Sequence, residues 1–251
     1  MRKYLSLAFV AMLIIASSSF ASVITNGGFE SGDTTGWTVS GDHSVISSFT
    51  PQFNVTLNGW EAGIPFYDQN TLLLGSGDIG NVWDDYHFST ATQTGTIDQA
   101  DVDDGLHLYF RWGALLEEPT NGVYHGDSGQ PYFSLTISSP GLGDIYFVDH
   151  RANQGGFTLV GTSASGDAGD IWWGTGTTDI DLAALGLGLG DQITISLYVT
   201  DCGQGGHGGL VFLDGFGTVD PGPTTVPEPT SLLLLGTGLL GAAAFRFRKS
   251  R

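Results

Sequence analysis

Hydrophobic and polar residues alternate with a period of two through several stretches of the chain. The clearest stretch is 193–199, where isoleucine, leucine and valine alternate with threonine, serine and tyrosine. The stretches 106–112 and 133–138 alternate in the same way. Successive side chains of a strand point to opposite faces of a sheet, so this period predicts strands with one apolar and one polar face.

Shorter apolar runs bounded by glycine, aspartate, asparagine and proline indicate further strands. These runs are 72–74, 145–148, 157–160 and 210–216. One helical turn is conceivable at 181–187, although its glycines oppose it. Two sheets packed face to face bury all the apolar faces at once. The sequence therefore predicts an all-β fold, a two-sheet antiparallel sandwich.

The N-terminus has the three parts of a secretory signal peptide. Arg2 and Lys3 precede an apolar run over 4–16, and small residues follow up to Ala21. A transmembrane helix needs about 20 apolar residues, more than this run contains. We therefore assign 1–21 to a signal peptide that is cleaved after Ala21.

The C-terminus carries a second apolar run, 232–245, which follows Pro227, Glu228 and Pro229 and precedes a basic cluster. Fourteen helical residues span about 21 Å, less than the roughly 30 Å of a hydrocarbon core, which makes a weak permanent anchor. The basic residues should stay cytoplasmic and leave the rest of the chain outside. We divide the remainder into a sandwich domain at 22–219, a Pro/Gly/Thr linker at 220–226 and a sorting or anchor segment at 227–251.

The order of Pro-Glu-Pro motif, short apolar helix and Arg-rich end resembles the PEP-CTERM sorting signal of Gram-negative bacteria that make exopolysaccharide. The resemblance implies an exosortase as partner, which recognises Pro227, Glu228 and Pro229 and processes the chain near them. It also implies attachment to the inner membrane through the C-terminal helix until processing, and then release to the cell envelope or the extracellular space. The competing interpretation is an ordinary tail anchor with a Pro-rich hinge.

Charge narrows the classes of partner. Residues 22–226 contain two basic and 25 acidic residues, a net charge of −23. Such a surface repels phosphate backbones and excludes nucleic-acid binding, while it can attract divalent cations. Cys202 is the sole cysteine, so the domain has no internal disulfide.

The edges of the domain carry a second resemblance. The segment Asn26–Gly32 with Gly36-Trp37 resembles the opening strand of jelly-roll carbohydrate-binding modules, and 210–216 resembles their closing strand. The resemblance implies that these strands lie side by side in a jelly-roll-like sandwich. It also implies a structural calcium, with Glu30 and Asp214 as ligands. In the alternative interpretation Glu30 is a turn acceptor and Asp214 a surface carboxylate.

Two other groups of residues could bind a metal. Asp98, Asp101, Asp103 and Asp104 crowd before Gly105, a density of oxygen ligands that suits calcium. The spacing does not support an EF-hand, and a solvated acidic turn is the alternative. The second group is His125, His207, Asp201 and Cys202, which could bind zinc, although its spacing suits hydrogen-bonded loops equally well.

Tryptophans are the candidate binding residues. Indole faces stack on sugar rings, and Trp60, Trp83, Trp172 and Trp173 lie in Gly-rich stretches where we expect exposed loops. Packing of these rings within the loops is the alternative.

Catalytic motifs are sparse. Residues 126–129 read Gly-Asp-Ser-Gly, as in trypsin-like proteases, but Gln130 replaces the next glycine and no histidine has the setting of that family. We therefore interpret the chain as an exported, non-catalytic protein of the envelope or extracellular matrix, with exopolysaccharide as its candidate ligand. The alternatives are a secreted hydrolase that acts on glycans and an inert matrix protein.

Overall fold

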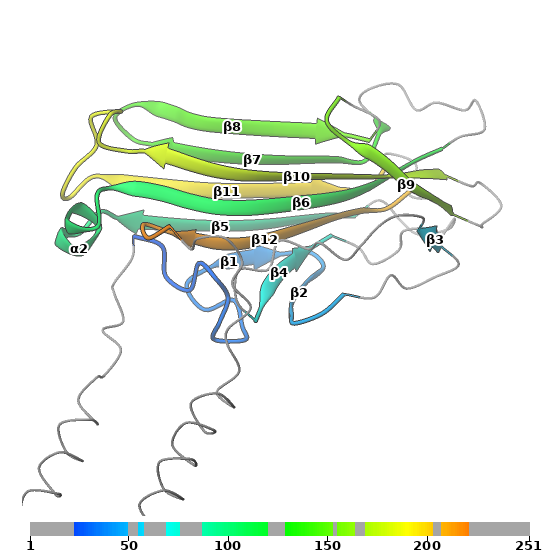
Figure 1. Ribbon diagram of the computed structural model, residues 1–251, viewed down its shortest axis with the longest axis horizontal. Coiled ribbons are helices and arrows are strands. Elements are labelled where there is room, and N and C mark those ends of the chain that lie inside the picture. The colour runs from blue at the N-terminus through cyan, green and yellow to red at the C-terminus, as the bar shows by residue number, and fades with distance from the viewer. Residues whose placement is uncertain are drawn as a thin grey trace, which may run out of the picture.

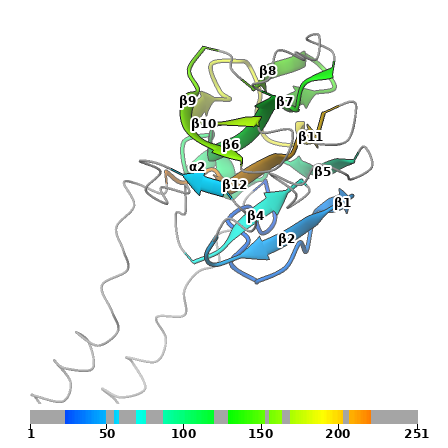
Figure 2. The ribbon, with the colours of Figure 1, turned by 90° about the vertical axis from the view of Figure 1, so that its right-hand side faces the viewer.

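A computed structural model describes residues 23–49, 55–57, 69–75, 87–119, 129–152, 155–163, 169–202 and 207–220. The predicted signal peptide and sorting segment lie outside these residues. Within them, strands form two antiparallel sheets that pack face to face (Figures 1 and 2). This confirms the predicted all-β, two-sheet antiparallel sandwich.

The smaller sheet has five strands in the order β1-β5-β11-β7-β8. Its strands are β1 (Thr38–Ser40), β5 (Phe88–Thr96), β11 (Gln192–Thr200), β7 (Tyr132–Ser139) and β8 (Gly143–Arg151). Buried and half-buried residues alternate strictly along β7, as the period of two in the sequence predicts. The inner residues of β11 and β7 are aliphatic or phenylalanine and are fully or almost fully buried.

The larger sheet has seven strands in the order β2-β4-β12-β6-β10-β9-β3. Its strands are β2 (His43–Ile46), β4 (Thr71–Leu74), β12 (Gly209–Gly217), β6 (His107–Pro119), β10 (Gly169–Asp181), β9 (Thr158–Ser163) and β3 (Val55–Leu57). The predicted strands 72–74, 106–112, 157–160 and 210–216 all fall in this sheet. The two layers are seen end-on in Figure 2.

The sequence analysis did not predict β1, β2, β3, β5 or β10, and β10 is the longest of these strands. Its residues 169–181 include five consecutive glycines and threonines at 174–178, a composition that suggests a loop. The glycines are there because aromatic rings lie against them: a Cβ added to Gly176 would sit 2.3 Å from Nε1 of Trp112, and one at Gly174 would sit 2.6 Å from the ring of Phe157. Glycine in this strand makes room for core rings.

The helical turn considered at 181–187, which the glycines of this stretch oppose, does not form. Residues 182–186 form hydrogen-bonded turns, in which the Asp181 carboxylate accepts the amide of Ala184 at 2.8 Å. Glycine disfavours a helix here because fixing its flexible backbone in a helix costs conformational entropy. Gly186 instead adopts a positive φ of 84°, which suits a turn.

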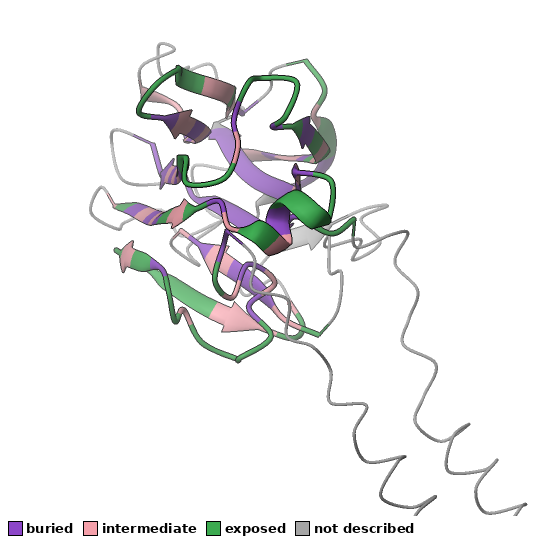
Figure 3. Cartoon of the chain, turned by 90° about the vertical axis from the view of Figure 1, so that its left-hand side faces the viewer, coloured by how far each residue is buried: buried purple, intermediate pink, exposed green. Residues whose placement is uncertain are grey.

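One short helix, α2 (Gln99–Asp103), follows β5 at one end of the sandwich. Figure 3 looks onto this end and shows buried residues between the sheets and an exposed side of α2. Asp98 caps the helix: its carboxylate accepts the amides of Ala100 and Asp101, and the Asp101 carboxylate accepts the amide of Asp98 in return. A helix of five residues depends on such caps, because its first amides have no partner within the helix.

Candidate functional site

Asp101 has a structural role that the calcium prediction did not foresee. Its side chain is fully buried, and one carboxylate oxygen accepts the amide of Val23 at 2.8 Å and the hydroxyl of Thr218 at 3.2 Å. The other oxygen accepts the amide of Asp98 at 2.9 Å. Asp98 and Asp101 therefore cap α2, and Asp101 also binds residues near both ends of the domain. Asp103 and Asp104 are exposed, and Asp103 accepts a bond from Gln99.

Glu30 and Asp214, the other predicted calcium ligands, both lie near Gly28. A Cβ added to Gly28 would sit 3.7 Å from Oδ1 of Asp214 and 3.7 Å from Cγ of Glu30. Glu30 accepts the amides of Gln69 and Asn70, at 3.0 and 2.8 Å, and Asp214 is fully buried. The opening segment and β12 are thus neighbours, as the jelly-roll resemblance implied.

The segment around Cys202 lies at the opposite end from α2. Nδ1 of His207 is 3.4 Å from Sγ of Cys202, and both side chains are buried. His125 lies outside the described residues. In the described part of the chain, no three His, Cys, Asp or Glu side chains are grouped so that they could hold a metal ion. The zinc hypothesis gains no support from these residues, and the calcium hypothesis remains a prediction.

The tryptophan prediction is wrong in one respect. Trp60 and Trp83 lie outside the described residues, but Trp172 and Trp173 lie within β10 and not in a loop. Adjacent residues of a strand face opposite ways, so the two rings cannot share a surface. Trp172 packs against the core between the sheets, and Trp173 packs on the outer side against Phe212, with ring centroids 5.8 Å apart. Both rings are half-buried and lie in a strand, so the predicted loop position is wrong, while a role of either ring in binding stays a prediction.

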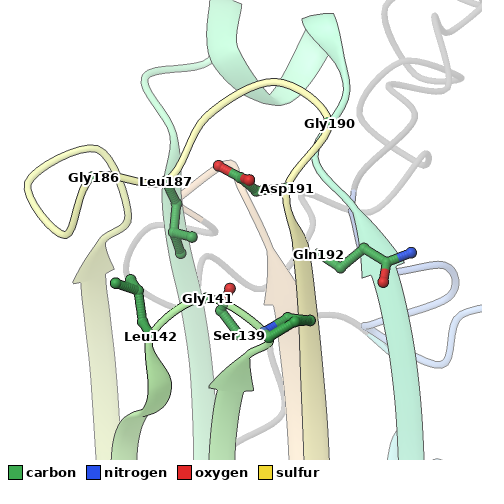
Figure 4. A pocket seen from close by; sticks show the side chains of 9 residues that line it. Ser139, Gly141, Leu142, Gly186, Leu187, Gly190, Asp191 and Gln192 are labelled. Carbon is green, nitrogen blue, oxygen red and sulfur yellow. The ribbon is translucent and has the colours of Figure 1, made fainter.

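Figure 4 shows a hollow of about 370 Å³ at the α2 end, between the β7–β8 turn and the loop that leads into β11. Leu142 and Leu187 face each other across it. Its single charged lining residue is Asp191, whose carboxylate already accepts the amide of Gly188 at 2.8 Å. The hollow has no convergent polar groups and is a poor candidate for a binding site.

A row of aromatic side chains crosses the outer face of the five-stranded sheet at the end opposite α2. Phe88 of β5 stacks on Tyr198 of β11, with centroids 6.0 Å apart and planes at 23°. Tyr198 in turn lies 6.3 Å from the ring of Tyr132 in β7. The guanidinium of Arg151 in β8 lies 4.8 Å above the Tyr132 ring. We call Phe88, Tyr198, Tyr132 and Arg151 the aromatic row.

Strand register brings the row together. Thr200 is the cross-strand partner of both Phe88 and Tyr132, and Tyr132 is the partner of Arg151. Residues paired in this way lie on the same face of a sheet. Phe88 is 50% exposed and the rest of the row is half-buried, so the rings present a continuous surface to solvent.

Polar groups surround the row. The Tyr132 hydroxyl donates to Oδ2 of Asp149 at 3.3 Å, and Arg151 lies 3.9 Å from the same oxygen. Burial, followed by the nearby Asp149 carboxylate, raises the pKa of Tyr132 above its ordinary value of 10.0, so its hydroxyl stays protonated and can donate. Ser134 lies opposite Asp149 in the register, and its neighbours on this face are mostly serine and threonine.

The signal for this row was present in the sequence. Tyr198 occupies the polar phase of the 193–199 alternation, together with Thr194 and Ser196. An aromatic residue in that phase lies on the solvent face of a strand. Phe88 and Tyr132, the first residues of β5 and β7, also occupy the solvent-facing phase of their strands.

Comparison with known proteins identifies the C-terminal segment. Residues 225–249 match the PEP-CTERM protein-sorting motif. This confirms the predicted sorting motif at Pro227, Glu228 and Pro229 and supports an exported protein. No curated protein matches the chain in sequence. In the part of the chain that the structure describes, no helix is long and apolar enough to span a membrane.

The search of solved structures finds β-sandwich modules. One is the Caldicellulosiruptor saccharolyticus module CBM27-1 in complex with mannohexaose, at 11% identity and TM-score 0.36, covering 78% of this chain and 95% of that one. Another is the K1 adhesin domain of Lys-gingipain from Porphyromonas gingivalis W83, at 11% identity and TM-score 0.33, covering 74% and 94%. A third is CBM28, a module specific for non-crystalline cellulose, at 12% identity and TM-score 0.30, covering 78% and 94%.

Proposed function

We propose that this chain is an exported protein that binds polysaccharide through the aromatic row. The observation that carries the proposal is the row itself: three rings with neighbouring centroids 6.0 and 6.3 Å apart on the solvent-facing side of the five-stranded sheet. The apolar C–H faces of pyranose rings stack on such surfaces, and the hydroxyl and carboxylate groups beside the row can bind sugar hydroxyls. Export is supported by the sorting motif at 225–249 and by the predicted signal peptide.

The charge around the row favours an uncharged glycan. Arg151 belongs to a domain with two basic and 25 acidic residues, and its guanidinium lies beside the Asp149 carboxylate at 3.9 Å. An acidic polysaccharide would meet a net charge of −23 and little uncompensated positive charge. Binding through rings and neutral hydrogen bonds should therefore depend only weakly on ionic strength.

The test uses the full chain and compares two phenylalanines on the outer face of the five-stranded sheet. Phe88 belongs to the row, whereas Phe147 of β8 is 57% exposed and lies outside it. Phe88→Ala and Tyr198→Ala should each weaken binding to the native host's exopolysaccharide or to a neutral mannan or glucan by about tenfold, which corresponds to about 1.4 kcal/mol. The melting temperature of Phe88→Ala should stay close to that of the wild type, because the exposed Phe88 ring contributes little to the core, whereas the half-buried Tyr198 contributes somewhat more.

Phe147→Ala is the matched control and should bind like the wild type. Equal losses from Phe88→Ala and Phe147→Ala would contradict a site at the row. Release of reducing sugar from the same glycans would favour the hydrolase interpretation instead. If the wild-type chain binds neither the host's exopolysaccharide nor any neutral or acidic polysaccharide tested, an inert matrix protein would be the better interpretation.

A further inference from the structure

Three of the four sheet edges in the described part of the chain are very short strands, and the fourth is long. The short edges are β1, β2 and β3, with three or four residues each, and the long edge is β8, with nine residues. Among the described strands β8 pairs with β7 alone, and both views of the ribbon place it at the border of the molecule (Figures 1 and 2). A long edge strand offers a row of backbone N–H and C=O groups to another chain.

The residues of β8 do little to block such pairing. Residues 145–148 read Ile-Tyr-Phe-Val, and the strand contains neither proline nor lysine, which often protect an edge. No residue of β8 is buried, and Phe147 is 57% exposed. The inner residues of the neighbouring β7, by contrast, are fully or almost fully buried. The burial of β8 is therefore that of a strand with a neighbour on one side only.

The two ends of β8 carry opposite charges on the same face. Asp144 lies opposite Ser138 of β7, and Arg151 lies opposite Tyr132. Ser138 and Tyr132 both occupy the outer, half-buried phase of β7, so Asp144 and Arg151 both lie on the outer face of the sheet. The register skips Ile145, a bulge that allows residues seven apart to share a face. The domain contains only two basic residues, and Arg151 is one of them.

We propose that two copies of this chain join through β8, antiparallel and two-fold symmetric, with Val148 on the axis. An axis perpendicular to the sheet keeps the two outer faces on the same side, so the two five-stranded sheets become one continuous sheet. With the bulge at Ile145, Asp144 of each copy then faces Arg151 of the other. The facing pairs, one residue from each copy, are Val148 with Val148, Phe147 with Asp149, Tyr146 with His150, and Asp144 with Arg151. No two carboxylates face each other in this register.

Charge complementarity selects a second copy as the partner. A foreign strand would need a basic residue opposite Asp144 and an acidic residue opposite Arg151, at the spacing that β8 itself supplies. The net charge of −23 on each domain opposes association, but it is screened beyond about 8 Å at physiological ionic strength, whereas the facing ion pairs act at contact. The other edges are too short to accept β8, so association closes at two copies and does not continue into a fibre.

Pairing through β8 does not depend on the proposed glycan site, although it affects how that site acts. The joined outer faces carry two aromatic rows, so a pair can hold a long polymer at two points. Phe147 lies beside the axis of the pair. The comparison of Phe88→Ala with Phe147→Ala is therefore made on the monomer, at concentrations below the dissociation constant of pairing.

The experiment measures the mass of the exported chain, purified from its native host, by sedimentation equilibrium at about 0.15 M salt. The wild type should reversibly reach twice the monomer mass. Asp144→Arg places two arginines opposite each other at both ends of the interface and should raise the dissociation constant at least about tenfold. Arg151→Asp should do the same with two aspartates. The double variant Asp144→Arg with Arg151→Asp restores opposite charges in reversed order and should pair again, which a merely structural effect of either substitution would not allow.

A cysteine on the axis tests the register. Val148→Cys should form a disulfide between copies under mild oxidation, because residues directly opposite in an antiparallel pair have Cβ atoms about 4.5 to 5.5 Å apart. Cys202 is fully buried and should not compete. Leu189→Cys is the control, since Leu189 is 63% exposed in the loop before β11, far from β8 in the register, and it should cross-link much less.

Four results would overturn the proposal. The first is a wild type that is still a monomer at about 100 µM. The second is a double variant that pairs no better than Asp144→Arg. The third is equal cross-linking of Val148→Cys and Leu189→Cys. The fourth is a Val148→Cys adduct whose mass shows a different protein, which would assign the edge to a foreign strand.

Discussion

The buried carboxylate of Asp101 accepts the backbone amide of Val23 at 2.8 Å, across 78 residues of sequence. The same side chain binds Thr218 at the end of β12 and the amide of Asp98 that begins α2. One acidic residue therefore joins the beginning of the domain, its end and its helix. This explains why a carboxylate is tolerated at a fully buried position: three donors satisfy its charge.

Asp101→Ala should destabilise the domain by about 3 to 5 kcal/mol, because it leaves three buried donors without their charged acceptor. The measurement is urea unfolding followed by tryptophan fluorescence. Asp104→Ala is the matched control, since Asp104 is exposed at the end of the same helix, and it should change stability by no more than about 0.5 kcal/mol. Similar losses in the two variants would show that the cluster acts through its total charge.

Trp173→Ala should affect stability and leave polysaccharide binding unchanged. The ring of Trp173 covers Gly113 and contacts Phe212 on the outer side of the seven-stranded sheet, away from the aromatic row. Removing a packed indole costs about 3 kcal/mol. Thermal unfolding and glycan affinity, measured on the same sample, separate the two effects. Leu159→Ala, at an exposed position of the neighbouring β9, should leave both quantities near the wild-type values. If Trp173→Ala folds but no longer binds glycan, the binding site would lie on the seven-stranded sheet and not at the aromatic row.

Two histidines should titrate on opposite sides of their ordinary pKa of 6.5. The hydrogen bond to Asp179, at 2.6 Å, raises the pKa of His107. Burial among Trp112, Phe133 and Phe157 lowers the pKa of His150. Nitrogen-15 NMR of the two imidazoles measures both values directly. A His107 value below that of His150 would contradict the structure.

The two shifts act on stability in opposite pH ranges. The contribution of His107 is fully present below about pH 6.5 and is lost as the pH rises through its raised folded pKa. His150 is neutral in the folded state, so stability falls as the pH drops below 6.5, where the unfolded chain takes up the proton first. In a plot of the free energy of unfolding against pH, His107→Gln should reduce the loss of stability above pH 6.5. His150→Phe should reduce the loss of stability below pH 6.5.

Calcium should raise the melting temperature if Glu30 and Asp214 contribute to a site beside Gly28. A cation at a hundredfold excess over its Kd adds about 2.7 kcal/mol to the folded state, or roughly 5 to 10 °C for a domain of this size. Scanning calorimetry with calcium and then with chelator measures the shift, and Glu30→Gln should reduce it. Superimposable curves for the wild type would remove calcium as a structural element.

The sequence predicted the strands whose two faces differ in polarity. The β11 and β7 regions were recognised because aliphatic residues alternate with serine and threonine, and the sandwich follows from burying those faces. It did not predict β10, because Gly174 and Gly176 carry no side chain that could signal a face. These positions are glycine because the rings of Phe157 and Trp112, from other strands or loops, lie against them. Contacts of that kind are invisible in a single stretch of sequence.

The site was harder to predict than the fold for the same reason. The sequence analysis took Asp101 as a cation ligand because acidic residues crowd there, whereas its partners Val23 and Thr218 are far away in the chain. Trp172 and Trp173 read as loop residues because glycines surround them. Phe88 and Tyr132 lie at strand ends, and only the register that pairs both with Thr200 shows that they form one surface.

The direction of the strands has a mechanical consequence. The chain leaves the domain at the end of β12, beside α2, whereas the aromatic row lies at the other end of the sandwich (Figure 1). Tension between an immobilised glycan and a tail held at the cell would run along the strand axes. The hydrogen bonds that join β12 to β6 and β4 would then be loaded together in shear and not opened one after another. If the proposed function is correct, this orientation would let the sandwich resist pulling between the bound glycan and the tail.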